Sequence, residues 1–280
     1  MIRIAFVILV AIVAAIAIAV LAGSRRWHRT SLDYEARLLR APAVTIATSF
    51  ERAANLPPPV AKYLRLVLKN QSRRITVARF SEAGELRTDV TSGRWMRFAA
   101  DQVVAPPALS FVWDARVRVF PLVHMRVRDA YVSGEGSGEV NLLSAVTIGR
   151  ERGGDVLAAG ELYRYLAEAV WYPTALLPGP QLVWTPIDDR AAQATLTHGA
   201  TTVSLQFRFN DAGEVTGVYT PSRPAKVAGG YESRAWEGHF RNYEARQGLL
   251  IPIDGVVGWY VAGEWHPVWR GIISTIDYTF

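Results

Sequence analysis

Beyond residue 73, apolar and polar residues alternate in short runs separated by glycine and proline, the pattern of antiparallel strands joined by tight turns. The clearest run is Val203–Phe209, in which every second residue is large and apolar and the residues between are polar. Such alternation points one row of side chains into a core and the other into solvent. Asn210–Gly213 then supplies a turn and Glu214–Tyr219 a returning strand, which predicts a β-hairpin.

Similar runs elsewhere in the chain predict further strands and two helices. The strands are expected at 75–80, 85–91, 111–119, 124–132, 182–187, 194–198, 235–243, 255–261 and 265–278. One helix is expected at Val60–Leu68, after three prolines, and a second at Glu161–Tyr172, ended by Pro173 and with an apolar stripe of Leu162, Tyr165, Leu166 and Ala169. About ten strands with one or two packed helices indicate an α+β fold, a large curved and mainly antiparallel sheet shaped as a half-barrel or barrel.

The N-terminal segment differs from the rest because Ile4–Ala22 contains only Ala, Val, Ile, Leu and Phe. Its nineteen residues would make a helix of about 28 Å, close to the thickness of a bilayer core. This predicts a single-pass membrane anchor. The alternative is a cleaved signal peptide, since Val20-Leu21-Ala22 before Gly23 resembles a cleavage site, but the apolar run exceeds the usual length of about 7 to 15 residues.

The sequence therefore divides into a transmembrane anchor at 1–24, a juxtamembrane basic linker or helix at 25–54, and a single β-rich domain at 55–280. Three arginine residues follow the apolar segment and one precedes it. This small excess of positive charge after the segment favours a cytoplasmic domain only slightly. Ala11, Ala15 and Ala19 share one helix face, so a homodimer through the anchor is an open alternative.

Charge and composition exclude several classes of function. The net charge is +6, but residues 1–40 hold six arginines against two acids, which leaves the remaining 240 residues at +2. So weak a basic excess argues against nucleic acid as a partner. The absence of cysteine excludes thiolate metal sites and cysteine nucleophiles, and the histidines are isolated, so we expect neither metal nor cofactor. Gly134–Gly138 lacks a phosphate-loop frame and is expected to be a flexible turn.

Acidic residues on the second helix are the candidates for catalysis. Glu161, Arg164 and Glu168 lie at helical spacing, and with Asp129 they offer carboxylates for general acid and base roles. The competing interpretation is a salt-bridge ladder along one edge of the helix.

Arginines and tryptophans are the candidates for ligand binding. Two neighbouring predicted strands carry Arg116 and Arg118, and Arg126 and Arg128, so that pairing them gathers four guanidinium groups on one face. These could hold an anionic headgroup, or they could simply form a solvated face. Aromatic side chains could line an apolar pocket or merely pack in the core. The remaining binding candidates are Trp113, Trp184, Trp236, Arg164 and Arg223.

The body of the chain resembles an uncharacterised bacterial family of N-terminally membrane-tethered proteins over roughly residues 55–278. The most specific element is Arg164-Tyr-Leu-x-Glu168 after Gly160-Glu161. Other residues that carry the resemblance are Leu56-Pro57, Phe111, Trp113, Asp129-Ala-Tyr131, Gly134, Gly136, Pro173, Trp184, Arg223, Trp236, Gly238, Tyr243, Gly248, Pro252 and Trp259. That family implies no activity. A more distant resemblance, of fold alone, is to lipoprotein-carrier half-barrels that hold acyl chains.

Three functions follow from these observations. The first is a membrane-tethered domain that binds a lipid or another hydrophobic ligand in a cavity of the curved sheet. The second is a hydrolase or transferase that uses Asp129, Glu161 or Glu168 as acid and base. The third is a structural or partner-binding protein of the cell envelope.

Overall fold

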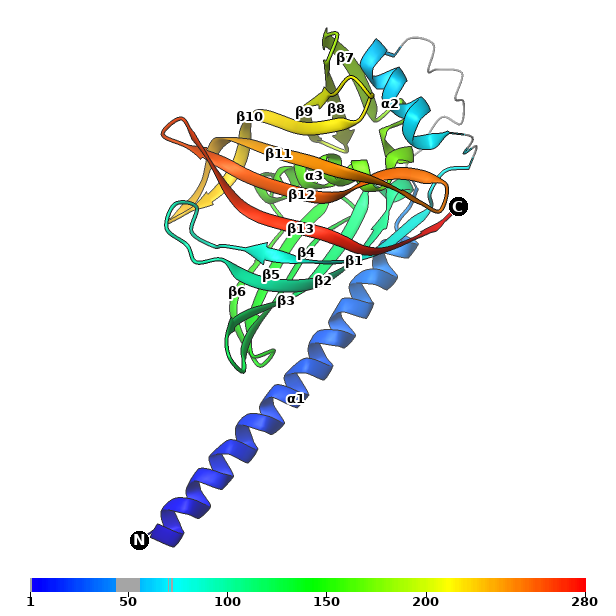
Figure 1. Ribbon diagram of the computed structural model, residues 1–280. Helices are drawn as coiled ribbons and strands as arrows, with labels where there is room; N and C mark the ends of the chain where they lie inside the picture. Colours follow the sequence, from blue (N-terminus) through cyan, green and yellow to red (C-terminus); the bar gives the residue numbers. More distant parts are fainter. Residues whose placement is uncertain (1, 44–55, 70, 72) are drawn as a thin grey trace.

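Thirteen strands form one open antiparallel sheet in the computed structural model, which describes residues 2–43, 56–69, 71 and 73–280 (Figure 1). The strands are β1 Val77–Leu86, β2 Met96–Ala105, β3 Ser110–Phe120, β4 Val123–Val132, β5 Glu135–Leu142, β6 Val146–Arg152, β7 Leu182–Asp188, β8 Ala191–His198, β9 Thr201–Phe209, β10 Val215–Val227, β11 Gly230–Arg246, β12 Leu249–Val261 and β13 Glu264–Thr279. Their order across the sheet is β6-β5-β4-β3-β2-β1-β13-β12-β11-β10-β9-β8-β7. Two meanders therefore meet where β1 pairs with β13.

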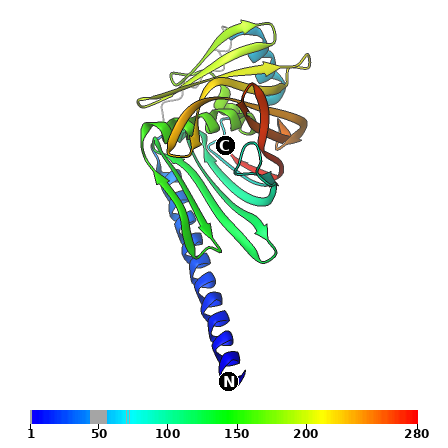
Figure 2. The ribbon, with the colours of Figure 1, turned by 90° about the vertical axis from the view of Figure 1, so that its left-hand side faces the viewer.

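The connection between the two meanders determines the shape of the molecule. Strands β6 and β7 are consecutive in the chain but lie at opposite edges of the sheet, so the segment between them must cross it. That segment contains α3, Asp155–Glu168, which lies across the concave side and contacts β4, β5, β9 and β10 (Figure 2). The predicted α+β fold is confirmed, and its sheet is a curved half-barrel that does not close.

The main core lies between the concave face of the sheet and the helices. On α3, the predicted apolar residues Leu162, Tyr165 and Leu166 are buried. On β9, every second side chain from Val203 to Phe209 is buried, which confirms the predicted hairpin with β10. Helix α2, Pro58–Leu68, packs its own apolar face against β8 and β12. Proline suits its first position because that residue has no helical partner for an N–H group.

Helix α1, Ile2–Arg40, runs out of the body as one continuous rod (Figure 1). Its C-terminal half packs on the outer face of β2, β3 and β4, where Trp27 and Leu38 are buried. Its N-terminal half makes no such contact: an 18-residue window of mean hydropathy 3.4 has none of its residues buried. Within the described part of the chain, this is the helix long and apolar enough to cross a membrane. The predicted linker at 25–54 is helical to Arg40, and residues 44–55 lie outside the described residues.

Two predictions in the first meander are wrong. The strand predicted at 85–91 ends at Leu86, and β2 was not predicted. The predicted flexible turn at Gly134–Gly138 is mostly strand β5. One of its glycines serves packing: a Cβ on Gly136 would lie 2.9 Å from backbone atoms of Leu157, so α3 can approach this strand only because the side chain is absent.

The predicted helix at 161–172 is confirmed over residues 161–168, but its start lies earlier in the chain and its last turn is not α-helical. Helix α3 begins at Asp155, and short 3-10 turns follow it at 169–171 and 173–176. Its first turns were missed because Gly160, a residue of low helix propensity, lies in the helix interior.

Replacing Phe207 by Asp tests the assignment of the buried row of β9. The ring is completely buried, so we expect the free energy of unfolding to fall by about 4 kcal/mol or more, through lost packing and an unpaired buried charge. Thermal unfolding of the full chain in detergent, followed by tryptophan fluorescence, measures the change. Thr202→Asp on the exposed side of the same strand is the control, with a change under about 0.5 kcal/mol. Similar melting of both variants would contradict the assignment.

Candidate functional site

The concave face of the sheet and α3 enclose a cavity of about 560 Å³. This volume is within the usual range of small-molecule sites, about 300–1,000 Å³. Most of its wall is apolar, and its aromatic side chains are Trp113, Trp171, Trp236, Phe240, Trp259 and Trp269. Trp171, from the turn after α3, packs edge-on against Phe240 at 6.0 Å between ring centroids. The rings therefore form a continuous apolar wall over several strands.

Burial differs between the two ends of the cavity. Near α3 the lining side chains of Ala167 and Trp171 are buried. At the other end the lining includes Thr88 and Ile148, which are exposed, and Met125, which is half-buried. These three residues lie just after β1 and near the β3–β4 and β5–β6 turns. The cavity thus opens toward these strand ends.

Arg164 on α3 is at the centre of a polar network at the closed end. Its Nε donates to Glu168 Oε1 at 2.7 Å, and its Nη1 donates to Asp129 Oδ2 at 3.0 Å. Burial lowers the pKa of Arg164, but the carboxylates of Glu168, Asp129 and Glu161 raise it by more, and the group stays charged. The guanidinium also lies 4.8 Å from the ring centre of Trp113. The ion pairs thereby fix α3 to β4.

Glu168 has little freedom to transfer protons. Its second oxygen, Oε2, accepts a hydrogen bond from Gln102 Nε2 at 2.6 Å, so both oxygens are occupied. This arrangement favours the salt-bridge interpretation of the helix edge over an acid and base pair. Within the described ranges there is also no group of three His, Asp or Glu side chains placed to hold a metal ion.

Two other carboxyl groups near the network have pKa values above their ordinary values. Burial, helped by the charge of Glu168, raises the pKa of Glu82 to about 7, although the Trp113 indole donates a hydrogen bond to it. Burial and the neighbouring Asp129 carboxylate raise the pKa of Glu161 to about 8. Asp129 itself is shifted upward, mainly by burial, against the opposing effect of Arg164. Burial therefore favours the protonated form of Glu161 at neutral pH.

Arg223 on β10 lines the same cavity but is bonded differently. Its guanidinium lies 4.6 Å from the Trp236 ring centre and 5.4 Å from that of Trp259, and its Nη2 donates to the Gly160 carbonyl oxygen at 3.0 Å. Its Nε is buried without a hydrogen-bond partner. Among the described residues no carboxylate forms an ion pair with it. Burial lowers the pKa of Arg223 to about 10, so the group remains positively charged at neutral pH.

The structure brings together six of the candidate residues from the sequence. Asp129, Glu168, Trp113, Arg164, Arg223 and Trp236 all line the cavity. Glu161 lies next to Gly160 on α3, where it interacts electrostatically with Asp129. Trp184 does not line the cavity: its Nε1 donates to the Leu176 carbonyl oxygen, and its ring packs on Phe207 in the core.

The four arginines of β3 and β4 lie on the opposite, outer face of the sheet. Arg116 and Arg126 are directly paired across the two strands. Arg116 and Arg118 are exposed and line a separate hollow near the β3–β4 turn. Pairing thus gathers the four arginines on one face, as expected, but alternation makes it the face opposite Trp113 and Asp129, so they do not line the apolar cavity.

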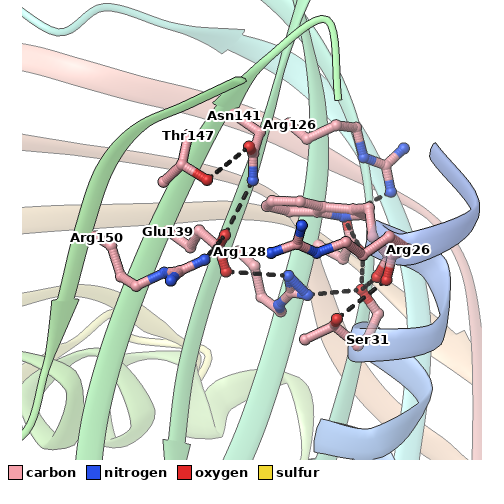
Figure 3. Close-up of polar contacts among 11 residues, drawn as sticks. Arg26, Ser31, Arg126, Arg128, Glu139, Asn141, Thr147 and Arg150 are labelled. Carbon is pink, nitrogen blue, oxygen red and sulfur yellow. Dashed lines mark hydrogen bonds and ion pairs between the residues drawn. The ribbon is translucent and has the colours of Figure 1, made fainter. Parts of the chain in front are cut away.

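Arg126 and Arg128 instead help hold α1 on the sheet (Figure 3). Asp114 on β3 accepts hydrogen bonds from Trp27 Nε1 at 2.9 Å and from Arg126 Nη2 at 2.6 Å. Arg128 is 3% exposed, and its guanidinium lies 4.1 Å from the Trp27 ring centre. A second set of contacts around Glu139 on β5 continues this interface, with Arg150 Nη2 donating to Glu139 Oε1 at 2.7 Å. Helix α1 is thus packed on the outer face through a buried polar interface.

Sequence analysis missed three residues of the site: Glu82, Gln102 and Trp171. Glu82 lies beyond the predicted end of the first strand, and Gln102 is in the strand that was not predicted. Gln102 could have been found, because it interrupts an apolar row of alternate residues in β2 and so indicates a buried polar contact.

Replacing Glu161 by Gln tests the electrostatics of the closed end. The native state keeps this proton up to a pKa of about 8, whereas the ordinary value is 4.5, so Glu161 makes folding less favourable as pH rises between these values. We therefore expect the variant to gain stability over the parent from pH 5 to pH 8, by about 3 to 4 kcal/mol. Denaturant titrations of the full chain at both pH values measure this difference.

Glu151→Gln is the control for this measurement, and the change in stability expected for it has the opposite sign. Hydrogen bonds from Lys226 and Tyr231 lower the pKa of Glu151, so its removal should cost stability above the ordinary pKa of 4.5. A gain for Glu161→Gln that does not change with pH would contradict the assigned protonation.

Comparisons with known proteins complete the description. No curated protein matches the sequence. A LolA superfamily protein from Nitrosomonas europaea resembles the chain with 8% identity and a TM-score of 0.37, over 79% of this chain and 92% of that one. A DUF1329 family protein from Desulfovibrio piger has 10% identity and a TM-score of 0.41, over 80% and 94%. A beta-barrel-like DUF1849 protein from Brucella abortus has 10% identity and a TM-score of 0.23, over 74% and 99%.

These likenesses are distant and concern the fold alone. The family resemblance rests on firmer ground, since a family model matches residues 54–278, nearly the span expected from the sequence. The chain therefore belongs to the family of unknown function DUF6920.

Proposed function

We propose that this protein is a membrane-tethered domain that holds an amphipathic, lipid-like ligand in the cavity of its curved sheet. The observation that carries the proposal is the combination, in one cavity of about 560 Å³, of an aromatic wall and a guanidinium whose buried Nε has no hydrogen-bond partner. Apolar walls with few polar groups are typical of sites for hydrophobic ligands.

The tether is supported by α1. Its apolar half is unburied, while the remainder of the same helix packs on the body through Trp27 and Leu38. The helix continues without a break through Gly23, where a signal peptide would be cleaved. A Cβ on Gly23 would lie 2.1 Å from the Ser144 carbonyl oxygen, so this residue is part of the packed interface. A retained anchor fits this arrangement better than a removed signal.

The two cavity arginines indicate the polarity of the ligand. Arg164 already pairs with two carboxylates, whereas Arg223 has an unpartnered Nε and lines the cavity. A guanidinium suits a carboxylate or phosphate group. The acidic group of the ligand would lie at Arg223, and its chain would lie along the tryptophans, where each buried methylene contributes about 0.8 kcal/mol.

Filling the cavity should abolish ligand retention. Gly149 lines it, and a Cβ there would lie 3.9 Å from the Val140 side chain, an ordinary contact, so Gly149→Trp adds an indole to the cavity wall without a backbone clash. We expect native mass spectra of the full chain, released from detergent, to show a lipid-mass adduct for the parent and none for this variant.

Gly179→Trp is the matched control, because Gly179 lies outside the cavity with no atom within 4 Å of the added Cβ. It should retain the adduct as the parent does. Equal adducts in Gly149→Trp and the control, or none in the parent, would count against a cavity ligand.

Replacing Arg223 by Met should weaken the binding of an acid but not of an alcohol. The probes are palmitic acid and 1-hexadecanol, added to the delipidated full chain and detected as retained adducts. Loss of a charge-assisted contact of about 1.5–3 kcal/mol predicts a tenfold or greater loss for palmitic acid. Arg190→Met removes a surface arginine whose side chain is 70% exposed and should change neither probe. An equal loss of both probes would contradict the role of Arg223.

A further inference from the structure

The turns of the β3–β4 and β5–β6 hairpins lie at one end of the body. Both point to the side on which the apolar half of α1 extends (Figures 1 and 2). The exposed end of the cavity lining, at Met125 and Ile148, is beside the same two turns.

The contact with α1 fixes the position of the β5–β6 turn along the axis of that helix. Gly23 packs directly on Ser144, and Ala19 and Ala22 share a hollow with Ser144 and Ala145. These helix residues are the last of the apolar segment. If the segment spans a bilayer, the turn therefore lies at the level where the hydrocarbon core ends.

The neighbouring β3–β4 turn reaches further out along the strand direction than the β5–β6 turn does. The Leu143 N–H group bonds to the His124 carbonyl oxygen, so the two turns are in register there. Leu122 lies two residues beyond His124, in the turn that joins β3 to β4. The β3–β4 turn thus extends past the level of Ser144.

The residues of these turns are unusual for a water-facing surface. Leu122 is 98% exposed and has φ of 65°, so neither packing nor backbone preference explains a leucine there. Phe120 and Val146 are each 57% exposed. A neighbouring hollow, lined by residues 94–99, 116 and 118–124, contains Arg94, Arg97, Arg116, Arg118 and Trp95, and no acidic residue. Apolar tips with arginine and tryptophan behind them are typical of a protein surface at a lipid interface.

We propose that these two hairpin turns enter the headgroup layer of the membrane that holds α1, with the four arginines of the hollow contacting anionic phospholipids. The mouth of the cavity then faces the lipid surface, and a ligand passes between bilayer and cavity without crossing water. The inference rests on the proposed anchoring of α1. It assigns Arg116 and Arg118 a partner that the cavity does not provide.

Site-specific labelling of the full chain tests the proposal, because the chain contains no cysteine. Single variants Leu122→Cys, Ile12→Cys and Asp189→Cys are labelled with the NBD fluorophore and reconstituted into vesicles of phosphatidylcholine and phosphatidylglycerol. Ile12 lies in the apolar half of α1, and Asp189 is exposed beside β7, at the far edge of the sheet. Because the Leu122 side chain is almost fully exposed, its replacement leaves the fold intact.

The expected result is a blue-shifted emission for the label at 122 and loss of most of its fluorescence when lipids carry a nitroxide on the upper acyl chain. The label at 189 should keep its fluorescence. Quenching at 12 but not at 122 would overturn this inference and leave the anchor in place. The absence of quenching at 12 would overturn both proposals.

A charge variant tests the role of the arginines separately. Arg116→Gln with Arg118→Gln should reduce the quenching at 122 in vesicles that contain phosphatidylglycerol. In vesicles of phosphatidylcholine alone, the same pair of substitutions should change it little. Equal quenching with and without both arginines in the anionic vesicles would contradict the proposed headgroup contact.

Discussion

The concave face of the sheet is larger than α3 can cover, and the rest of the architecture follows from this constraint. Strands β6 and β7 lie at opposite edges, so the chain between them must pass over the concave face. Helix α3 and the turns after it bury part of that face, and aromatic side chains such as Trp171 and Phe240 line what is left. Because the sheet stays open, the remaining space is a cavity with an exposed end.

Aromatic packing and paired charges fix α1 to the other face of the sheet. A buried arginine, Arg128, stacks on Trp27, while the Asp114 carboxylate accepts hydrogen bonds from Trp27 and Arg126. Arg126 pairs with Asp114 and Arg128 with Glu139, which lowers the cost of burying these charges. The consequence is functional as well as structural: a rigid helix gives the body one orientation relative to whatever surrounds the apolar half of α1.

The two arginines of the cavity have the same side chain but different partners. Arg164 pairs with Asp129 and Glu168 and holds α3 to β4, so its charge is already compensated. Arg223 lies over the rings of two neighbouring tryptophans, with one backbone hydrogen bond and a buried Nε without a partner. A compensated charge stabilises the fold, whereas a guanidinium with unused donors in an apolar cavity is suited to an anionic ligand.

The sequence by itself determined the apolar N-terminal helix, the sheet-rich body, the buried row of β9 and the residue types of the site, because each is a local pattern of hydrophobicity or spacing. It placed Arg223 and Trp236 among the candidates without indicating that they stack. Only the tertiary structure decided which face of β3 and β4 meets the cavity, that Gly136 belongs to a strand, and that Gln102 closes the network. These outcomes depend on register and on the path of α3 between the sheet edges, which are long-range choices that no local pattern encodes.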